Sequence, residues 1–312
     1  MTASKARAAG YRAVESFATR VVALVPESEE LTPLPTRPTE LGALPAAARS
    51  QLEEFCGDLA RERMLIIPGT QRRPSRWRRP ALRTRVVAFG SRAVGQWTED
   101  DAEGVVEFMP IDDVRAIDDR LILLHGRLSV IGQHGRIDVY YSAVARRQLR
   151  ECILWLRGEV AGPEVATRPG FVWIGDRGDE RPKSELPHKW AYMLDHRDDL
   201  RIDPSANEMV AVGDVTEIGR SRGPATGIAV LGPRELVIAA EPPDSLRGSR
   251  YGVDLTVVPR CFLGDVGWSR GNLQIRLRED DNLPGGTPIS RPLDERLFRA
   301  MRRSFGDAVP WA

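Results

Sequence analysis

The stretch from Thr70 to Arg85, TQRRPSRWRRPALRTR, gathers the residues of this chain with the clearest capacity to bind a charged ligand. Arginine pairs with phosphate and carboxylate groups through two parallel N–H donors, and tryptophan can stack on a nucleic-acid base. Prolines at 74 and 80 oppose a helix, so no DNA-recognition helix forms here. The candidate binding residues are Arg72, Arg73, Arg76, Trp77, Arg78 and Arg79.

Three interpretations of this stretch stay open. It is a solvated connector whose arginines pair with the acidic residues 99–103; or it contacts a protein or anionic lipid, at about 1 kcal/mol per charge; or it binds nucleic acid. The net charge of only +1 gives no global field for nucleic acid. Lysine occurs at three positions against 42 arginines, a bias typical of GC-rich bacterial genomes, so part of the arginine excess has no functional meaning. The sequence favours the connector.

Other residue patterns supply no reaction. The chain contains no GxGxxG, GxxxxGK[ST], GxSxG or HExxH motif. His188 and His196 are eight residues apart, which is not the zinc-binding spacing. Adjacent acids such as Asp112–Asp113 and Asp118–Asp119 would point to opposite faces of a strand and look like turn residues. We therefore predict no enzyme, no cofactor and no metal site.

The cysteines and the hydropathy pattern indicate a cytoplasmic protein. Cys56, Cys152 and Cys261 are odd in number and form no CxxC pair, which suits a reducing compartment. No run of 18 apolar residues predicts a membrane span. The apolar run VVALV near the N-terminus is too short for a signal peptide.

The 312 residues suggest about two domains. Residues 4–25 have the spacing of an amphipathic helix, 26–45 form a proline-rich linker, and 46–65 return to helical spacing, with an apolar stripe that includes Leu52, Phe55, Leu59 and Met64. We assign 1–80 to N-terminal helices and a linker, 81–160 to a first domain, 161–205 to a connector, and 206–312 to a second domain.

Each of the two domains reads as short strands followed by one closing helix. In the first, strand-length runs end in a helix whose apolar face holds Leu149, Cys152, Ile153 and Leu156, and Gly158 supplies its stop. In the second, the helical apolar face holds Leu293, Leu297, Ala300, Met301 and Phe305.

The two domains also align with each other. VVAFGSRAVGQW at 86–97 matches IAVLGPRELVIA at 228–239, which places Gly90 and Gly232 in turns where glycine would adopt positive φ. Pro110 then matches Pro259, and the pair Asp113–Val114 matches Asp265–Val266. We infer an internal duplication.

This order of strands, a further set of strands and one closing helix resembles the bacterial pleckstrin-homology-like (PH-like) family. RVVAFGSRAVGQW, EFMPIDDVRAI and ARRQLRECILWLR carry the resemblance in the first copy, and GIAVLGPRELVIA, DLTVVP and LDERLFRAMRRSF in the second. The resemblance implies an α+β chain with two tandem antiparallel β-barrels, each closed by a C-terminal helix and preceded by N-terminal helices. Family members mostly bind and seldom catalyse. Lipid-binding members use basic residues in the first strand–strand loop, where this chain has only Arg92 and Arg234.

These observations predict a non-catalytic cytoplasmic binding or scaffold protein that engages a protein or peptide by strand addition at an open sheet edge beside the closing helix. The two copies can also pack together and leave one binding face. The alternative is a peripheral membrane protein that binds anionic lipid through the N-terminal helix and the arginines 72–85; an enzyme of unknown class is third, and nucleic acid is the least favoured partner. A homo-oligomer is compatible with the sequence.

Overall fold

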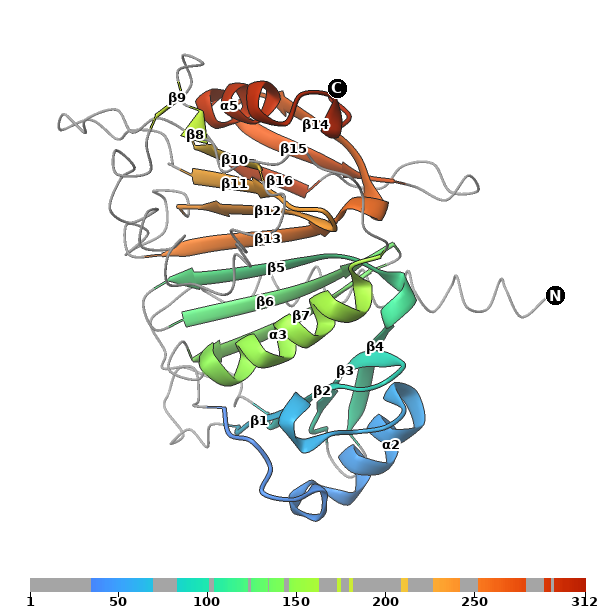
Figure 1. Ribbon diagram of the computed structural model, residues 1–312. Coiled ribbons are helices and arrows are strands. Elements are labelled where there is room, and N and C mark those ends of the chain that lie inside the picture. Colours follow the sequence, from blue (N-terminus) through green and yellow to red (C-terminus); the bar gives the residue numbers. More distant parts are fainter. Residues whose placement is uncertain are drawn as a thin grey trace. The chain divides into compact units, whose positions relative to one another are not determined.

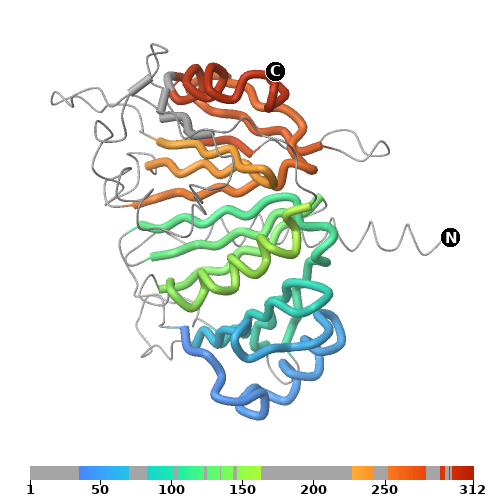
Figure 2. Tube along the Cα trace, viewed as in Figure 1, coloured from blue at the N-terminus to red at the C-terminus, as the bar shows by residue number. Residues whose placement is uncertain are grey.

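Antiparallel strands and a few helices make up the described part of the chain. The computed structural model describes residues 35–69, 83–100, 104–122, 125–133, 135–142, 146–162, 173–174, 180–181, 209–212, 227–241, 252–278, 289–292 and 295–312. They belong to one compact unit, Pro33–Ala312 (Figures 1 and 2). The predicted helix at residues 4–25 lies outside the described residues. The mixture of helices with antiparallel sheets confirms the α+β class at this level.

The first half of the fold is a four-strand meander, a short 3-10 helix, a three-strand meander and a helix. The first four strands are β1 (Met64–Ile67), β2 (Arg85–Phe89), β3 (Ala93–Thr98) and β4 (Val105–Pro110). After the 3-10 helix Ile111–Asp113 come β5 (Val114–Ile122), β6 (His125–Gly132), β7 (Arg136–Ser142) and α3 (Arg146–Val160). Helix α2 (Ala46–Cys56) precedes them and packs on β2 and β3 through Leu52 and Cys56.

The second half repeats that order. Its four strands are β10 (Met209–Val212), β11 (Gly227–Leu231), β12 (Glu235–Ala240) and β13 (Val253–Pro259). The 3-10 helix Arg260–Phe262, β14 (Leu263–Ser269), β15 (Asn272–Leu277), β16 (Ile289–Pro292) and α5 (Glu295–Phe305) follow. Two short strands of the predicted connector, β8 (Trp173–Ile174) and β9 (Glu180–Arg181), extend the sheet beyond β10.

The two halves share details as well as order. The β2–β3 and β11–β12 turns are closed by the same backbone bond, Gly90 N–H to Ala93 O and Gly232 N–H to Glu235 O. The 3-10 helices begin with matching bonds, from Ile111 N–H to Arg92 O and from Arg260 N–H to Arg234 O. Strands β5 and β14 each carry an irregularity at the same place, Val114/Ala116 and Leu263/Asp265. The duplication inferred from the sequence is therefore present in the backbone.

Two details of the sequence alignment were wrong. Pro110 and Pro259 correspond, but Val114 at the start of β5 corresponds to Leu263 at the start of β14, and not to Val266. Gly90 and Gly232 are in turns, yet neither has a positive φ. Gly90 is required for another reason, because a Cβ there would lie 2.4 Å from the carbonyl oxygen of Cys56.

The halves are joined edge to edge by the pairing of β5 with β13. A nine-stranded sheet results, in the order β7-β6-β5-β13-β12-β11-β10-β8-β9, with β1–β4 and β14–β16 as separate sheets (Figure 1). Among the described strands no pairing closes either half into a barrel. The two copies, which the sequence left free to pack together or not, are joined by this pairing of β5 with β13, and we call it the seam.

The main hydrophobic core crosses the seam. It contains the buried face of α3 together with residues of β13 and β12, such as Val257 and Val237. All four residues predicted for the apolar face of α3 are buried: Leu149, Cys152, Ile153 and Leu156. The second core lies under α5, where the predicted Leu297, Ala300, Met301 and Phe305 are buried; Leu293 lies outside the described residues.

Two helix boundaries differ from prediction. The helix expected over 46–65 ends at Cys56, because Gly57 has φ 78° and its N–H donates to Glu53 O. Met64 begins strand β1 instead of extending the helical stripe. Gly158 does not stop α3, which continues to Val160 before Gly162 adopts φ 62°.

We expect the two partners of one buried ion pair at the joint between the halves to depend strongly on each other. Arg157 of α3 is fully buried, and its Nε lies 3.2 Å from Glu235 Oε2 of β12. Glu235→Gln removes the carboxylate charge that faces a buried guanidinium and should lower the free energy of unfolding by about 3 kcal/mol, measured by urea denaturation. Replacing both partners (Arg157→Met with Glu235→Leu) should recover most of that loss.

The matched control is the exposed pair of Glu295 and Arg299 on α5, 3.0 Å apart. Glu295→Gln should cost no more than about 1 kcal/mol. Equal losses from the two glutamate substitutions would contradict a special role for the buried pair.

Candidate functional site

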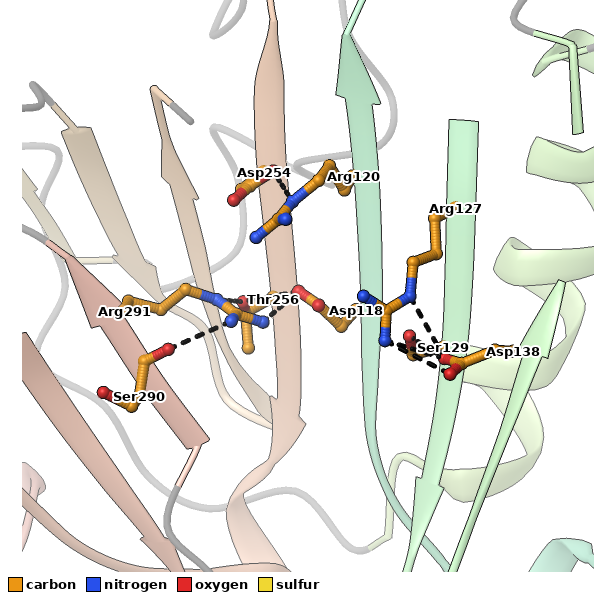
Figure 3. Close-up of polar contacts among 9 residues, drawn as sticks. All are labelled: Asp118, Arg120, Arg127, Ser129, Asp138, Asp254, Thr256, Ser290 and Arg291. Atoms are coloured by element: carbon orange, nitrogen blue, oxygen red, sulfur yellow. Dashed lines mark hydrogen bonds and ion pairs between the residues drawn. The ribbon is translucent and has the colours of Figure 1, made fainter. Parts of the chain in front are cut away.

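The seam carries a network of ion pairs and side-chain hydrogen bonds. Five residue pairs align across it, from Leu121–Val253 to Ile117–Val257. On one face of the sheet, Arg120 lies opposite Asp254, with Nε 2.9 Å from Oδ1, and Asp118 lies opposite Thr256 (Figure 3).

Arg291 of β16 closes this network from the second half. Its Nε donates to Thr256 Oγ1 at 2.9 Å, and its guanidinium pairs with Asp118. Thr256 in turn donates to Asp118 Oδ1 at 3.1 Å. Figure 3 shows Arg291 reaching over β13 to β5. Three strands from both halves thus meet at one carboxylate.

The network continues onto β6 and β7 with its charges matched. Arg127 Nη2 lies 3.2 Å from both carboxylate oxygens of Asp138, which also accepts from Ser129 and pairs with Arg136. Burial raises the pKa of Asp254, and the Arg120 guanidinium opposes that rise. Acids that are each paired with arginine hold strands together, and none is left as a general base.

Asp119, the neighbour of Asp118, points to the opposite face of the sheet. There it accepts from the Tyr141 hydroxyl and lies 3.9 Å from Arg146. The expectation that these neighbouring acids do not share a site is confirmed. The expectation that they are turn residues was wrong, because both lie in the middle of β5.

Most of the predicted arginine site lies outside the described residues. This applies to Arg72, Arg73, Arg76, Trp77, Arg78 and Arg79. The last two arginines of the stretch are described: Arg83 pairs with Asp100, and Arg85 Nη2 donates to Tyr140 O at 3.3 Å. Burial lowers the pKa of Arg85. Both arginines therefore bind the chain itself, and the pairing of Arg83 with Asp100 is of the kind that the connector interpretation expects.

Arg92 caps a helix. Its Nη2 donates to Glu54 O at 2.7 Å, and its backbone N–H donates to Cys56 O at 2.9 Å. Ser91 assists by accepting from Asp58 N–H. The cation thus sits at the negative end of the α2 dipole and satisfies terminal carbonyls. Arg234, its counterpart in the β11–β12 turn, is exposed, and the two are not brought together in one site by any contact among the described residues.

An exposed apolar surface on β4 was missed by the sequence analysis. The large hydrophobic residues exposed in the described part are Phe55, Val105 and Phe108, at 37%, 54% and 42%. Phe55 of α2 stacks on Phe108 with ring centroids 4.8 Å apart. We call these three residues with strand β4 the β4 edge. The sequence did contain one indication of this surface. The run VVEFM at 105–109 lacks the polar face expected of an edge strand.

Glu107 is the one charged residue of β4. Its side chain remains accessible, but partial desolvation first, and the nearby Asp138 carboxylate second, raise its pKa. β4 pairs with β3 on one side, and no described strand pairs with its other side. The β4 edge therefore combines backbone groups that no described strand pairs with, apolar side chains, and an acid whose charged form a nearby cation would stabilise.

Chemistry of other kinds finds little support in the described residues. Burial raises the pKa of the Cys56 and Cys152 thiols to about 12, so neither is a nucleophile at neutral pH. In this part of the chain no group of three His, Cys, Asp or Glu residues could hold a metal ion, and no helix is long and apolar enough to cross a membrane.

Comparisons with protein-family models, with curated proteins and with solved structures found no match.

A pH-dependent loss of stability should follow from removing Arg120. Arg120→Gln takes away the charge that lowers the pKa of Asp254, so this pKa rises further above its unfolded value. Stability is then lost as pH rises through the folded-state pKa and regained below it. Urea denaturation should show a larger deficit at pH 7 than at pH 4.5. Adding Asp254→Asn should abolish that difference, and its persistence would exclude Asp254 as the cause.

The capping role of Arg92 predicts a stability effect of its own. Arg92→Ala should lower the free energy of unfolding by about 0.5–1 kcal/mol, and Arg92→Lys by less, because lysine can also bind the last carbonyls. Thermal unfolding followed by circular dichroism measures both. Arg234→Ala is the matched control and should have almost no effect; equal effects at the two positions would contradict the capping role.

Proposed function

We propose that this chain is a non-catalytic binding or scaffold protein, and that it engages an extended protein or peptide segment by adding it as a strand to the β4 edge. The observation that carries this proposal is the coincidence of exposed Phe55, Val105 and Phe108 with a strand that no described strand pairs with on one side. Soluble proteins usually protect such a strand with charge, proline or cover. Phe55 and Phe108 form an exposed aromatic pair on one face of β4, and Val105 is exposed on the other; exposed large apolar side chains beside a strand edge are typical of a binding site.

The chemistry of the β4 edge indicates what kind of segment would fit. Main-chain hydrogen bonds to β4 supply affinity, and alternate side chains supply selectivity. Val105 and Phe108 project to opposite faces of β4, so apolar residues on both faces of the added strand would be buried. A lysine or arginine of the segment near Glu107 would relieve the repulsion between Glu107 and Asp138.

We further propose that each half is a PH-like domain. The support is the repeated order of four strands, a 3-10 helix, three strands and a closing helix, together with the matching turn bonds. Binding without catalysis agrees with that proposal, because this family mostly binds. The paired charges of the seam also favour it, since the acids there are held by arginines and are not poised to transfer protons.

The test is capture of partners by the full chain and by its Phe108→Lys variant. Lysine at 108 places a charge in the apolar surface and opposes strand addition. We expect the native chain to capture one or more proteins from a lysate of its source cells, and the variant to lose at least ten-fold of that capture, quantified by mass spectrometry.

Ser50→Lys is the matched control, because Ser50 is exposed on α2 outside the β4 edge. It should capture as much as the native chain. Equal capture by the native chain and the Phe108→Lys variant would place binding elsewhere, and capture of nothing by the native chain would contradict the scaffold function.

A further inference from the structure

We infer that the partner of the β4 edge is strand β14 of a second copy of this chain, and that residues 310–312 suppress this assembly by covering β14. The inference rests on the proposed use of the β4 edge and adds the identity of its partner. The resulting contact would repeat, between molecules, the seam that already joins the two halves within one molecule.

The duplication makes the two contacts equivalent. The seam pairs β5, the first strand of the three-strand meander in the first half, with β13, the last strand of the four-strand meander in the second half. The counterpart of β13 is β4, and the counterpart of β5 is β14. After the seam has formed, β4 and β14 are the corresponding edges, and neither pairs with a described strand of the other half.

The edge of β14 is covered by the last residues of the chain. Val266 N–H donates to Pro310 O at 2.9 Å, and Ala312 N–H donates to Val266 O at 3.1 Å. Trp311 lies beside Val266 in a parallel bridge, and its ring packs edge-to-face on Phe298 of α5, with centroids 5.7 Å apart. We call residues 310–312 the strap. The strap occupies the position on β14 that β13 occupies on β5.

The register of the seam can be carried over to the proposed contact. Ile117 pairs with Val257 in the seam, and their counterparts are Val266 and Phe108. Arg120 pairs with Asp254, and their counterparts are Ser269 and Val105. An aromatic ring opposite a β-branched residue is a favourable cross-strand pair. Phe108 of one copy would thus take the place of Trp311 against Val266 of the other, and an exposed apolar residue would become buried.

The strap is the weaker occupant of the two. It is attached to β14 at a single bridge, whereas the seam aligns five residue pairs. Its advantage is that it belongs to the same chain, which gives it an effective concentration of about millimolar order. Removing the strap should therefore expose a strand edge that β4 of another copy can pair with. The contact is head-to-tail, so it propagates instead of closing as a dimer.

The experiment measures self-association of purified protein by sedimentation velocity over a range of concentrations. The shortened chain ends at Val309, which keeps the buried Val309 side chain and removes the strap. We expect species larger than a dimer to form at concentrations at least ten-fold lower than for the full chain. Phe108→Lys in the shortened chain should restore the monomer, and Ser50→Lys should not.

A mixing experiment tests the polarity of the contact. Of the two edges in the proposed contact, the shortened chain with Phe108→Lys offers β14, and the full chain offers β4. Together they should form a one-to-one complex and nothing larger. Trp311→Ala in the full chain is a second way to loosen the strap, and it should increase association without shortening the chain.

The inference is overturned if the shortened chain keeps a cooperative thermal transition and stays monomeric, or if Phe108→Lys leaves its association unchanged. If shortening unfolds the chain, the Trp311→Ala variant decides in the same way. Capture of a different protein through the β4 edge, with no self-association, would overturn this inference and leave the proposed function standing. Self-association that Phe108→Lys abolishes, with no capture of any other protein, would support this inference and contradict a scaffold function for other partners.

Discussion

The antiparallel pairing of β5 with β13 is the interaction on which the rest of the structure depends. It converts two open edges, one from each half, into the middle of a nine-stranded sheet. Because the sheet is continuous, α3 packs over strands of both halves, and its buried Arg157 reaches β12. Arg291 of β16 reaches Asp118 of β5 on the opposite face. The halves are thus joined by backbone bonds, a shared hydrophobic core and ion pairs on both faces.

Several arginines of this chain form buried or partly buried ion pairs that connect its strands and helices. Arg157 and Arg291 are almost completely buried, and Arg120 lies opposite a buried Asp254. A guanidinium suits this role because its planar donors match a carboxylate and keep their charge at any accessible pH. Such pairs cost desolvation and add little net stability, but each requires its partner, so together they specify one alignment of β5 against β13. A slip of one residue would move Arg120 from the polar face of β5 to the face that packs under α3, and would separate Asp118 from Thr256.

Local pattern was enough to predict much of this fold. The hairpin β2–β3, the counterpart hairpin β11–β12 and the apolar faces of α3 and α5 depend on neighbouring residues, and all were found. Strand β1 was not predicted, because Met64 fits the helical spacing of residues 46–65. The structure shows that the helix already ends before Gly57. The seam could not be read from the sequence, since its strands are more than a hundred residues apart and nothing local names the partner. Asp118 and Asp119 were interpreted as turn residues for the same reason. An acid in a central strand needs a partner for its charge, and here the arginines that pair with them lie far away in the sequence. The same distinction applies to the candidate site. Arg92 could be selected from the sequence because it lies in a predicted turn, whereas the β4 edge becomes visible only once the pairing of the strands is known.

When two copies of a fold join through one edge of each, the counterpart of each joined edge is left over in the other copy. Here the joined edges are β5 and β13, the remaining ones are β14 and β4, and they differ in what covers them. The β14 end is covered by three residues whose tryptophan packs on Phe298, a cover held by few contacts. The β4 end has no cover among the described residues and is guarded by Glu107 alone, in a strand that Gly104 precedes and Pro110 ends. A carboxylate opposes strand addition by remaining charged. Desolvation and the Asp138 carboxylate raise the pKa of Glu107, so its charged form is less stable here than it would be in water. A cation near Glu107 would stabilise its charged form. An edge protected by one such acid therefore disfavours strands without a matching cation and still accepts a strand that carries one.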